Sequence, residues 1–383
     1  MSHVTVELDR LRPRLAELGR EARPADVAAE MRRLGWVVTD ELLLSTVEAL
    51  RRDATGAGVL EPLLALPGVT DVLVNGPDQV FVDRGHGLEQ VALAFTDDDE
   101  VRRLASRLAA RVGRRLDDSA PFVDARLPDG TRVHAVLGTL ADPGTCLSLR
   151  VPAGRRFSLE DWVAVGSLPP GGAEVLRRLV ACRAAFLVSG GTGSGKTTLL
   201  ASLLSLVPAH ERLLVVEDSR ELAPDHPHCV RLEGRPPNAE GAGAVSLSDL
   251  VRQALRMRPD RVVLGEVRGA ELCDLLTALN TGHEGGCGTV HANSADDVPA
   301  RLEALAALGG MGRDALHSQV AAALDAVIHI RRDAAGLRRV GGVAVLVRDP
   351  GSGYVTTLPA VHFGPAGLTK GPGSAALERL LGR

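Results

Sequence analysis

The sequence has few aromatic residues and little lysine. Lysine occurs only at positions 196 and 370, so nearly all positive charge is arginine. Phe, Trp and Tyr make up 2% of the 383 residues, so a platform of rings for stacking single-stranded bases would be hard to build. The formal net charge of −4 provides no overall attraction for nucleic-acid phosphates or anionic lipid. We therefore expect no direct binding of nucleic acid.

The sequence also lacks paired cysteines and long apolar runs. Its five cysteines, at positions 146, 182, 229, 273 and 287, include no Cys-x-x-Cys pair, which argues against a zinc ribbon or a disulfide framework and suits a reducing cytosol. No uncharged apolar run approaches the roughly 18–20 residues that a membrane helix needs, and the first residues alternate charges with leucines, so we expect no secretory signal. The 45% hydrophobic and 24% charged residues are typical of a soluble globular protein of two or three domains.

The first part of the sequence predicts helices followed by a small α+β domain. Residues 1–55 have the apolar spacing of helices, and Asp40 is a candidate helix cap. Residues 56–155 combine helical and hairpin patterns, which indicates an α+β domain. These patterns are two hairpins that turn at 76–78 and 128–130, a helix over 98–116 and a strand over 146–151.

The second part of the sequence predicts an α/β core. Residues 156–172 belong to a Pro- and Gly-rich stretch that predicts an interdomain linker. In residues 173–363 apolar runs alternate with helical patterns, which predicts βαβ units and a mostly parallel sheet covered on both faces. We expect a long exposed loop from Glu233 to Val245 and a weakly ordered tail over 364–383. The predicted strands are 185–189, 211–216, 261–265 and 286–290, and the predicted helices lie near 196–206, 247–257, 269–280 and 295–307.

The most specific motif is a phosphate-binding loop between a predicted strand and a predicted helix. It has the pattern G-x-x-x-x-G-K-[ST], in which glycines let backbone amides point at phosphate oxygens at a helix N-terminus. Lys196 can bridge the β- and γ-phosphates of ATP, and the hydroxyl of Thr197 can ligate Mg²⁺. The candidate nucleotide-binding residues are Gly190, Gly191, Thr192, Gly193, Ser194, Gly195, Lys196, Thr197 and Thr198.

Two apolar strands end in carboxylates that could act beside this loop. Ligands of open α/β sheets bind at the carboxyl ends of the strands. Glu266, after strand 261–265, is the candidate for activating the attacking water and for reaching Mg²⁺ through a water molecule. Glu217, after strand 211–216, is the second candidate, ahead of its neighbour Asp218. Either glutamate could instead cap a helix or pair with Arg220 or Arg268.

Two histidines, His283 and His291, bracket the Gly-rich strand 286–290. Only Cys287 stands at a spacing that could complete a metal site with them. A lone histidine is more often a structural residue, so position by itself favours that interpretation.

Together the motifs resemble the secretion, or traffic, ATPases, which power type II and type IV secretion and type IV pili. The resemblance runs from about residue 55 to 345, and the N-terminal half is similar to the CpaF-type ATPases of tight-adherence (Flp) pili. Type II members carry a tetracysteine zinc module that these cysteines cannot form, which favours the tight-adherence branch. The segments that carry the resemblance are GGTGSGKTT, VVEDSREL, LRMRPDRVVLGEVRGAE, TGHEGGCGTVHANS, EPLLALPGVTDVLVNGPDQVFV, GRRLDDSAPFVDARLPDGTRVHAV and LSLRV.

The resemblance implies a homohexamer whose subunits join an N-terminal domain to a RecA-like core, with nucleotide between the two. It places Glu217 in the family's Asp box and makes Glu266 the Walker B catalytic glutamate. His283 and His291 fall in the His box, on the γ-phosphate side, which replaces the structural interpretation. Arginines of the N-terminal domain act as fingers on the γ-phosphate, and the best matches are Arg132, Arg150 and, third, Arg126.

The leading hypothesis is therefore a cytoplasmic, Mg-dependent ATPase motor. It would act at the inner face of the cytoplasmic membrane through platform proteins of a pilus or secretion system. The alternative is a conjugation-type ATPase that supports DNA transfer. A GTPase is excluded because neither lysine lies in an Asn-Lys-x-Asp motif, and a small-molecule kinase would not need the histidine box.

Overall fold

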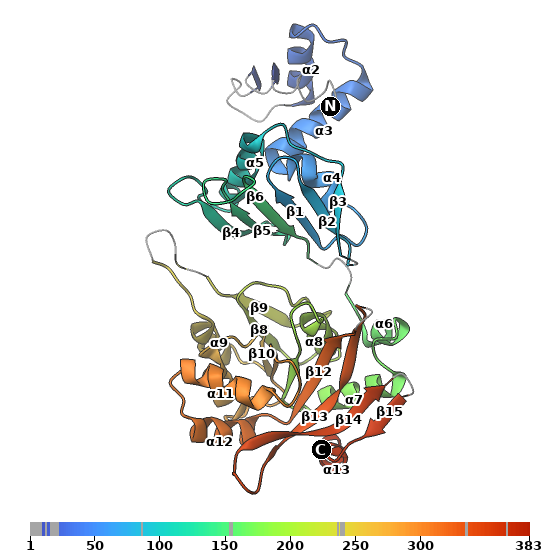
Figure 1. Cartoon of the computed structure of the whole chain (residues 1–383), viewed down its shortest axis with the longest axis vertical. Coiled ribbons are helices and arrows are strands. Elements are labelled where there is room, and N and C mark those ends of the chain that lie inside the picture. Colours follow the sequence, from blue (N-terminus) through green and yellow to red (C-terminus); the bar gives the residue numbers. More distant parts are fainter. Residues whose placement is uncertain are drawn as a thin grey trace. The chain divides into compact units, whose positions relative to one another are not determined.

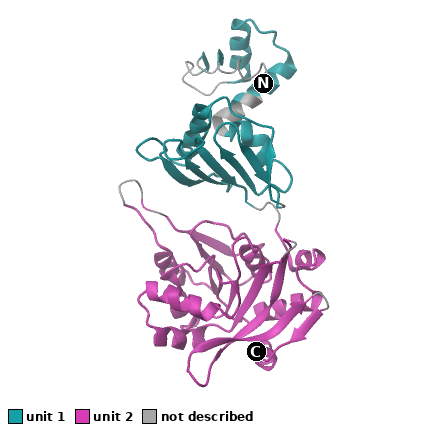
Figure 2. Ribbon diagram, viewed as in Figure 1, with its two compact units in different colours: residues 1–153 teal, residues 154–383 magenta. Residues whose placement is uncertain are grey.

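The computed structural model consists of two compact units, residues 1–153 and 154–383 (Figures 1 and 2). None of the described helices is long and apolar enough to cross a membrane. The structure describes residues 10–11, 14–15, 23–85, 87–152, 156–235, 237, 242–333, 336–364 and 367–383.

Unit 1 begins with two amphipathic helices, α2 (Pro24–Arg33) and α3 (Asp40–Thr55). Val27 and Met31 of α2 are buried in a small apolar cluster. The predicted cap is displaced by one residue, because Asp40 is the first residue of α3 and the hydroxyl of Thr39 accepts a hydrogen bond from the amide of Leu42. Much of the predicted helical region before Arg23 lies outside the described residues.

The rest of unit 1 is an antiparallel sheet with the helix α5 (Asp98–Ala110) against its buried face. Among the described residues the sheet has six strands in the order β3-β2-β1-β6-β5-β4. Strand residues alternate between buried and more exposed, as in a sheet with one covered face. The strands are β1 (Asp71–Asn75), β2 (Val80–Asp83), β3 (Leu88–Val91), β4 (Phe122–Arg126), β5 (Arg132–Val136) and β6 (Cys146–Arg150), and η1 (Gly58–Leu60) and α4 (Glu61–Leu64) precede them.

Unit 2 is built on one large mixed sheet. Its described strands lie in the order β15-β14-β13-β12-β7-β11-β10-β8-β9. The pairs from β12 to β9 are parallel, and β13, β14 and β15 extend the sheet antiparallel to one another. The strands are β7 (Phe186–Ser189), β8 (Leu213–Glu217), β9 (Cys229–Glu233), β10 (Arg261–Leu264), β11 (Cys287–Val290), β12 (Ala326–Arg332), β13 (Arg338–Arg348), β14 (Val355–Gly364) and β15 (Gly367–Lys370).

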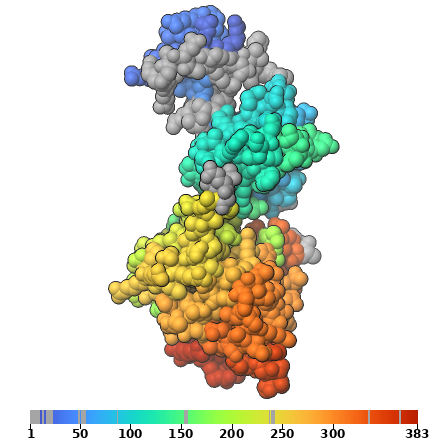
Figure 3. Space-filling view, turned by 90° about the vertical axis from the view of Figure 1, so that its left-hand side faces the viewer, coloured from blue at the N-terminus to red at the C-terminus, as the bar shows by residue number. Residues whose placement is uncertain are grey.

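Helices cover both faces of this sheet and bury two apolar layers. One layer contains α6 (Leu159–Ala164), α7 (Pro170–Ala181), α8 (Lys196–Leu204) and α13 (Ser374–Leu381). The other contains α9 (Leu247–Leu255), α10 (Glu271–Leu279), α11 (Val298–Leu308) and α12 (Arg313–Ala323). Segments of this second layer form the yellow and orange surface in Figure 3.

Strand β11 lies between β7 and β10, and there is no room for a side chain at Gly286, just before the strand, or at Gly288 within it. A Cβ on Gly286 would lie 2.8 Å from the carbonyl oxygen of Val262, and one on Gly288 would lie 2.9 Å from that of Leu264. The glycines thus let the strand pass close to the backbone of β10.

Two segments are more ordered than the sequence predicts. The predicted linker, 156–172, contains α6 and the start of α7, and Trp162 of α6 is buried. The tail expected to be weakly ordered over 364–383 forms β15 and α13, because Leu377 and Leu380 are buried in the core. In the predicted loop Glu233–Val245, Arg235 and Val245 form an isolated bridge, and residues 236 and 238–241 lie outside the described part.

Candidate functional site

The phosphate loop has the backbone shape that its glycines permit. It leaves the buried strand β7 after Ser189 and enters α8 at Lys196. Gly193 (φ +68°) and Gly195 (φ +100°) adopt left-handed conformations that favour glycine. A Cβ on Gly190 would lie 2.2 Å from the carbonyl oxygen of Ile330, whereas Gly191 and Gly193 face open space. The loop thus forms an open cradle at the N-terminus of a helix, where anions bind.

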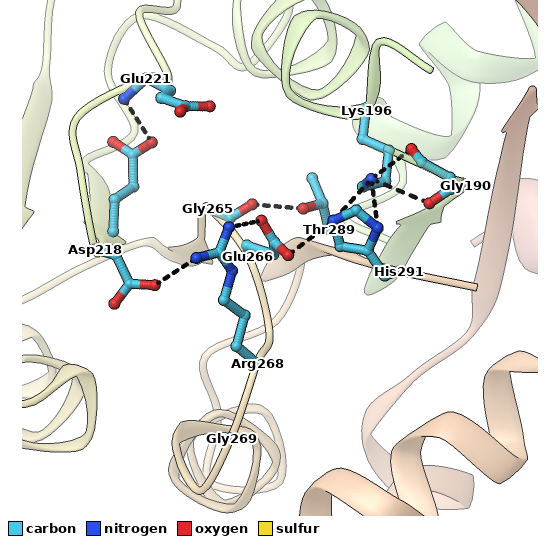
Figure 4. A network of polar contacts seen from close by, with 12 residues as sticks. Gly190, Lys196, Asp218, Glu221, Gly265, Glu266, Arg268, Gly269, Thr289 and His291 are labelled. Atoms are coloured by element: carbon cyan, nitrogen blue, oxygen red, sulfur yellow. Dashed lines mark hydrogen bonds and ion pairs between the residues drawn. The ribbon is translucent and has the colours of Figure 1, made fainter. Parts of the chain in front are cut away.

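Lys196 is buried, and its ammonium group is bonded to its own loop (Figure 4). Nζ donates to the carbonyl oxygens of Gly190 (3.0 Å) and Gly191 (2.9 Å). Burial lowers the pKa of Lys196, against the raising effect of the nearby Glu266 carboxylate. The ammonium group therefore already lies in the loop that would bind the phosphate oxygens.

Glu266 is the second residue after β10 and lies at the carboxyl end of that strand. Both of its carboxylate oxygens have partners (Figure 4). Oε2 accepts a hydrogen bond from Nη2 of Arg268 over 2.7 Å, and Oε1 lies 3.0 Å from Nε2 of His291. Burial opposes ionisation of Glu266, but Arg268, His291 and Lys196 outweigh it and hold its pKa below the usual value. Glu266 is thus held as a carboxylate.

His291 connects this carboxylate to the phosphate loop. It follows β11, and both of its ring nitrogens lie 3.4 Å from Nζ of Lys196. Burial and the charge of Lys196 lower the pKa of His291, which favours the neutral imidazole. His283 instead lies before β11, at the amino end of that strand. Its Nδ1 lies 3.2 Å from the carbonyl oxygen of Ala278. The structure therefore separates the two predicted histidines.

Glu217 is buried at the end of β8 and supports the loop that follows. Its Oε1 accepts hydrogen bonds from the amides of Glu221 (3.0 Å) and Leu222 (2.8 Å), and Oε2 has no hydrogen-bond partner among the described residues. Burial raises the pKa of Glu217 to about 7. A Cβ on Gly265 would lie 2.4 Å from Cγ of Glu217, so this side chain lies against β10 and not in the Lys196 network.

Two further residues of the site, Glu221 and Arg268, were not predicted as site residues, and Arg268 was considered only as an ion-pair partner. Glu221 is exposed, and its charge adds a little to the raised pKa of Arg268 and slightly offsets the lowering of the Lys196 pKa by burial. Arg268 contacts Glu266, and its Nη1 lies 3.5 Å from Oδ2 of Asp218, which the sequence ranked behind Glu217 (Figure 4). The spacing E-D-x-x-E and the arginine two residues after Glu266 were the available signals.

The three candidate arginine fingers lie in one row of the sheet of unit 1. Arg126, Arg132 and Arg150 occupy neighbouring register positions on β4, β5 and β6. Arg132 Nη2 pairs with Asp124 Oδ2 (2.6 Å), and Arg150 Nε pairs with Asp71 Oδ1 (3.1 Å). Nε of Arg126 donates to the carbonyl oxygen of Gly130 over 3.2 Å. Their assignment as fingers stays a prediction.

The donors near the loop fit a Mg²⁺ ion that arrives with its nucleotide. Among the residues that the structure describes, no group of three or more His, Cys, Asp and Glu side chains could hold a metal ion. Thr197, in the first turn of α8, is half-buried, and Glu266 follows β10 close to Lys196, the residue before Thr197. A hydroxyl and a carboxylate are oxygen donors of the kind that Mg²⁺ takes in addition to water and phosphate.

The phosphate loop, the strand-end glutamate and the parallel sheet define a P-loop nucleoside triphosphatase. The chain belongs to the type II/IV secretion system protein family, whose model matches residues 53–340. The members of this family are ATPases, and this chain is an ATPase with an N-terminal domain and a RecA-like core.

Two of the known proteins similar to the chain carry descriptions from conjugal transfer and type IV secretion. A Mycobacterium tuberculosis protein described as a "Putative conjugal transfer protein" is 54% identical over 325 residues, which cover 83% of this chain and 92% of that protein. The type IV secretion system protein VirB11 of Brucella suis is 32% identical over 330 residues, or 78% of this chain and 90% of that one. The crystal structure of the pilus retraction motor PilT with bound ADP has a TM-score of 0.54 and 20% identity, covers 85% of this chain and 86% of that one, and is similar in fold.

Proposed function

We propose that the chain is a motor that hydrolyses Mg·ATP to power pilus assembly or secretion across a cell envelope. One observation carries the proposal: Lys196, His291, Glu266 and Arg268 form a connected polar cluster after three neighbouring parallel strands, β7, β11 and β10. The cluster combines cations for phosphate oxygens with one carboxylate for a water molecule. Phosphoryl transfer needs both, because catalysis there is mostly positioning and charge stabilisation.

In this proposal the phosphate loop binds the triphosphate. Lys196 exchanges its bonds to the carbonyl oxygens of Gly190 and Gly191 for bonds to β- and γ-phosphate oxygens. The loop amides and the N-terminus of α8 bind the remaining phosphate oxygens. Thr197 would hold Mg²⁺ directly and Glu266 would reach it through water, and the bound ion would neutralise charge on the phosphate oxygens.

Glu266 then acts on the attacking water. The water oxygen forms a bond to the γ-phosphorus while the bond from that phosphorus to the β–γ bridging oxygen breaks. The electron pair leaves with ADP, and the water proton passes to Glu266, which yields inorganic phosphate. His291, which contacts both Glu266 and Lys196, would respond to the γ-phosphate. Glu217 would contribute by holding the loop that carries Glu221.

The motor would work as a homohexamer at the inner face of the cytoplasmic membrane, in contact with platform proteins of its system. Arg132, Arg150 or Arg126 would supply positive charge to the γ-phosphate in the closed ring. Oligomer formation should then respond to nucleotide.

We propose the tight-adherence pilus as the system that the motor serves, on the resemblance of residues 55–150 to that branch. A conjugation-type system is the second candidate, because the Mycobacterium tuberculosis relative carries that description and VirB11 belongs to type IV secretion. Co-purification distinguishes them: small apolar platform proteins and pilins support the first, and DNA-relaxing enzymes support the second.

The test of the ATPase mechanism compares Lys196→Ala with Glu266→Gln. Lys196→Ala should abolish nucleotide binding, because it removes the cation of the cradle. Glu266→Gln should retain binding and lower ATP turnover by about 10² to 10⁴-fold, the usual contribution of a general base. Binding is measured by calorimetry and turnover by phosphate release. Undiminished turnover in Glu266→Gln would remove the catalytic assignment.

A further inference from the structure

Arg268 lies in the loop that joins β10 to α10, and the backbone of this loop is held without help from the Arg268 side chain. Glu271, buried in the first turn of α10, accepts hydrogen bonds through Oε1 from the amides of Arg268 (2.6 Å) and Gly269 (2.7 Å). The amide of Val267 donates to the carbonyl oxygen of Thr289 on β11 over 2.8 Å. Replacing the Arg268 side chain therefore leaves these backbone hydrogen bonds in place.

The Arg268 guanidinium joins acidic residues that follow two neighbouring strands (Figure 4). Nη2 donates to Oε2 of Glu266 over 2.7 Å, on the side of β10. Nη1 lies 3.5 Å from Oδ2 of Asp218, which follows β8. Because a guanidinium presents its donors in a rigid planar fork, contact with both carboxylates restricts the rotation of the Glu266 carboxylate.

Anchoring one oxygen of Glu266 leaves the other turned toward the phosphate loop. Oε1 lies 3.0 Å from Nε2 of His291, whose ring is 3.4 Å from Nζ of Lys196. We propose that Arg268 is a positioning residue for ATP hydrolysis, which holds Oε2 of Glu266 so that Oε1 faces the attacking water. Asp218 steadies Arg268 in this arrangement. The inference rests on the proposed role of Glu266.

The experiment measures ATP turnover and nucleotide binding of the full chain and its variants. Arg268→Ala should lower kcat by about 10- to 100-fold, because misplacing a reacting group by about 1 Å costs roughly that much, while KM stays within about threefold. Arg268→Lys should recover part of kcat, since an ammonium restores the charge without the fork. Asp218→Asn should lower kcat less than Arg268→Ala does.

Combined variants separate positioning from other roles. If Arg268 acts through Glu266, Arg268→Ala should cause no further loss of turnover in a chain that already carries Glu266→Gln. Arg252→Ala is the matched control, because Arg252 is also an exposed arginine in an ion pair, with Asp274 at 3.0 Å, and it should retain kcat.

Wild-type kcat in Arg268→Ala, or an added loss on the Glu266→Gln background, would overturn the inference. If Arg268→Ala does not fold, unchanged kcat in both Arg268→Lys and Asp218→Asn overturns it. Full turnover in Glu266→Gln is a different result, because it would remove the proposed function itself.

Discussion

Lys196 shows at the residue scale that nucleotide binding is an exchange of partners. Its ammonium group is already bonded to the carbonyl oxygens of Gly190 and Gly191, and both oxygens of Glu266 are occupied by Arg268 and His291. A triphosphate must replace the bonds of Lys196 to its own loop, so its affinity reflects the difference between the new and the lost interactions. Partner exchange also keeps the buried cation from being left unpaired between turnovers.

Glu217 should make the stability of the protein depend on pH near neutrality. Its pKa is raised to about 7 in the folded chain from 4.5, so the folded state binds this proton more tightly than the unfolded state. The stabilisation is complete below about pH 4.5 and is lost as the pH rises to about 7, by up to about 3 kcal/mol. Glu217→Gln should remove this loss, so the variant should be more stable relative to wild type at pH 8 than at pH 5.

Urea unfolding of both proteins at these two pH values measures the effect. Glu89→Gln, at an exposed position of β3, is the control and should follow wild type at both. Equal pH dependence of wild type and Glu217→Gln would mean that Glu217 is ionised in the folded chain.

The sequence was sufficient to place Lys196 and Glu266 but not to choose among the acids after β8. Strand-end position predicts which residues reach the carboxyl edge of a parallel sheet, and this holds for Glu266. It does not predict which way a loop then turns. The chain folds back after Glu217, whose carboxylate accepts from the amides of Glu221 and Leu222 and so faces inward.

At the element scale, periodicity predicted the parallel βαβ region well because its strands are continuous apolar runs buried on both faces. Periodicity did not predict α6 and α13, because both helices lie in segments with many Pro and Gly residues. Trp162 anchors α6 in the predicted linker, and its Nε1 donates to Oγ of Ser202 on α8 over 2.9 Å. Leu377 and Leu380 anchor α13 in the tail, because both side chains are buried in the core. Such burial depends on distant segments that local patterns do not show.

The close passage of β11 along β10 predicts a steric cost at Gly288. Gly288→Ala should lower the free energy of unfolding by about 1–3 kcal/mol, because the new Cβ would lie 2.9 Å from the carbonyl oxygen of Leu264. Gly341→Ala in β13 is the matched control, since its nearest contact is 3.6 Å, an ordinary distance. Denaturant unfolding measures both variants, and equal stabilities would show that β11 can shift to accept a methyl group.

At the scale of the whole molecule, the arginine row of unit 1 provides a test of the proposed oligomer. Arg132→Ala should leave nucleotide binding unchanged and slow hydrolysis in the oligomer by at least about tenfold. The loss should stay smaller than the roughly 10³-fold loss typical of an arginine finger, because Arg126 and Arg150 lie next to Arg132. Turnover is measured at protein concentrations where the oligomer forms. Arg103→Ala on the exposed side of α5 is the control. An unchanged rate would make Arg132 a structural residue paired with Asp124.

The order of strands in unit 2 also connects the phosphate loop, through β12, to the long strands β13 and β14. β12 runs beside β7 up to the pair His329–Ser189, and the next carbonyl, of Ile330, touches the loop at Gly190. From there β13 and β14 continue as a ribbon, and the 11 residues of β13 span about 36 Å. Hydrogen bonds join β12, β13 and β14 in turn, so a substitution that shifts the backbone of this ribbon should also shift Ile330, whose carbonyl oxygen lies beside Gly190 of the nucleotide site.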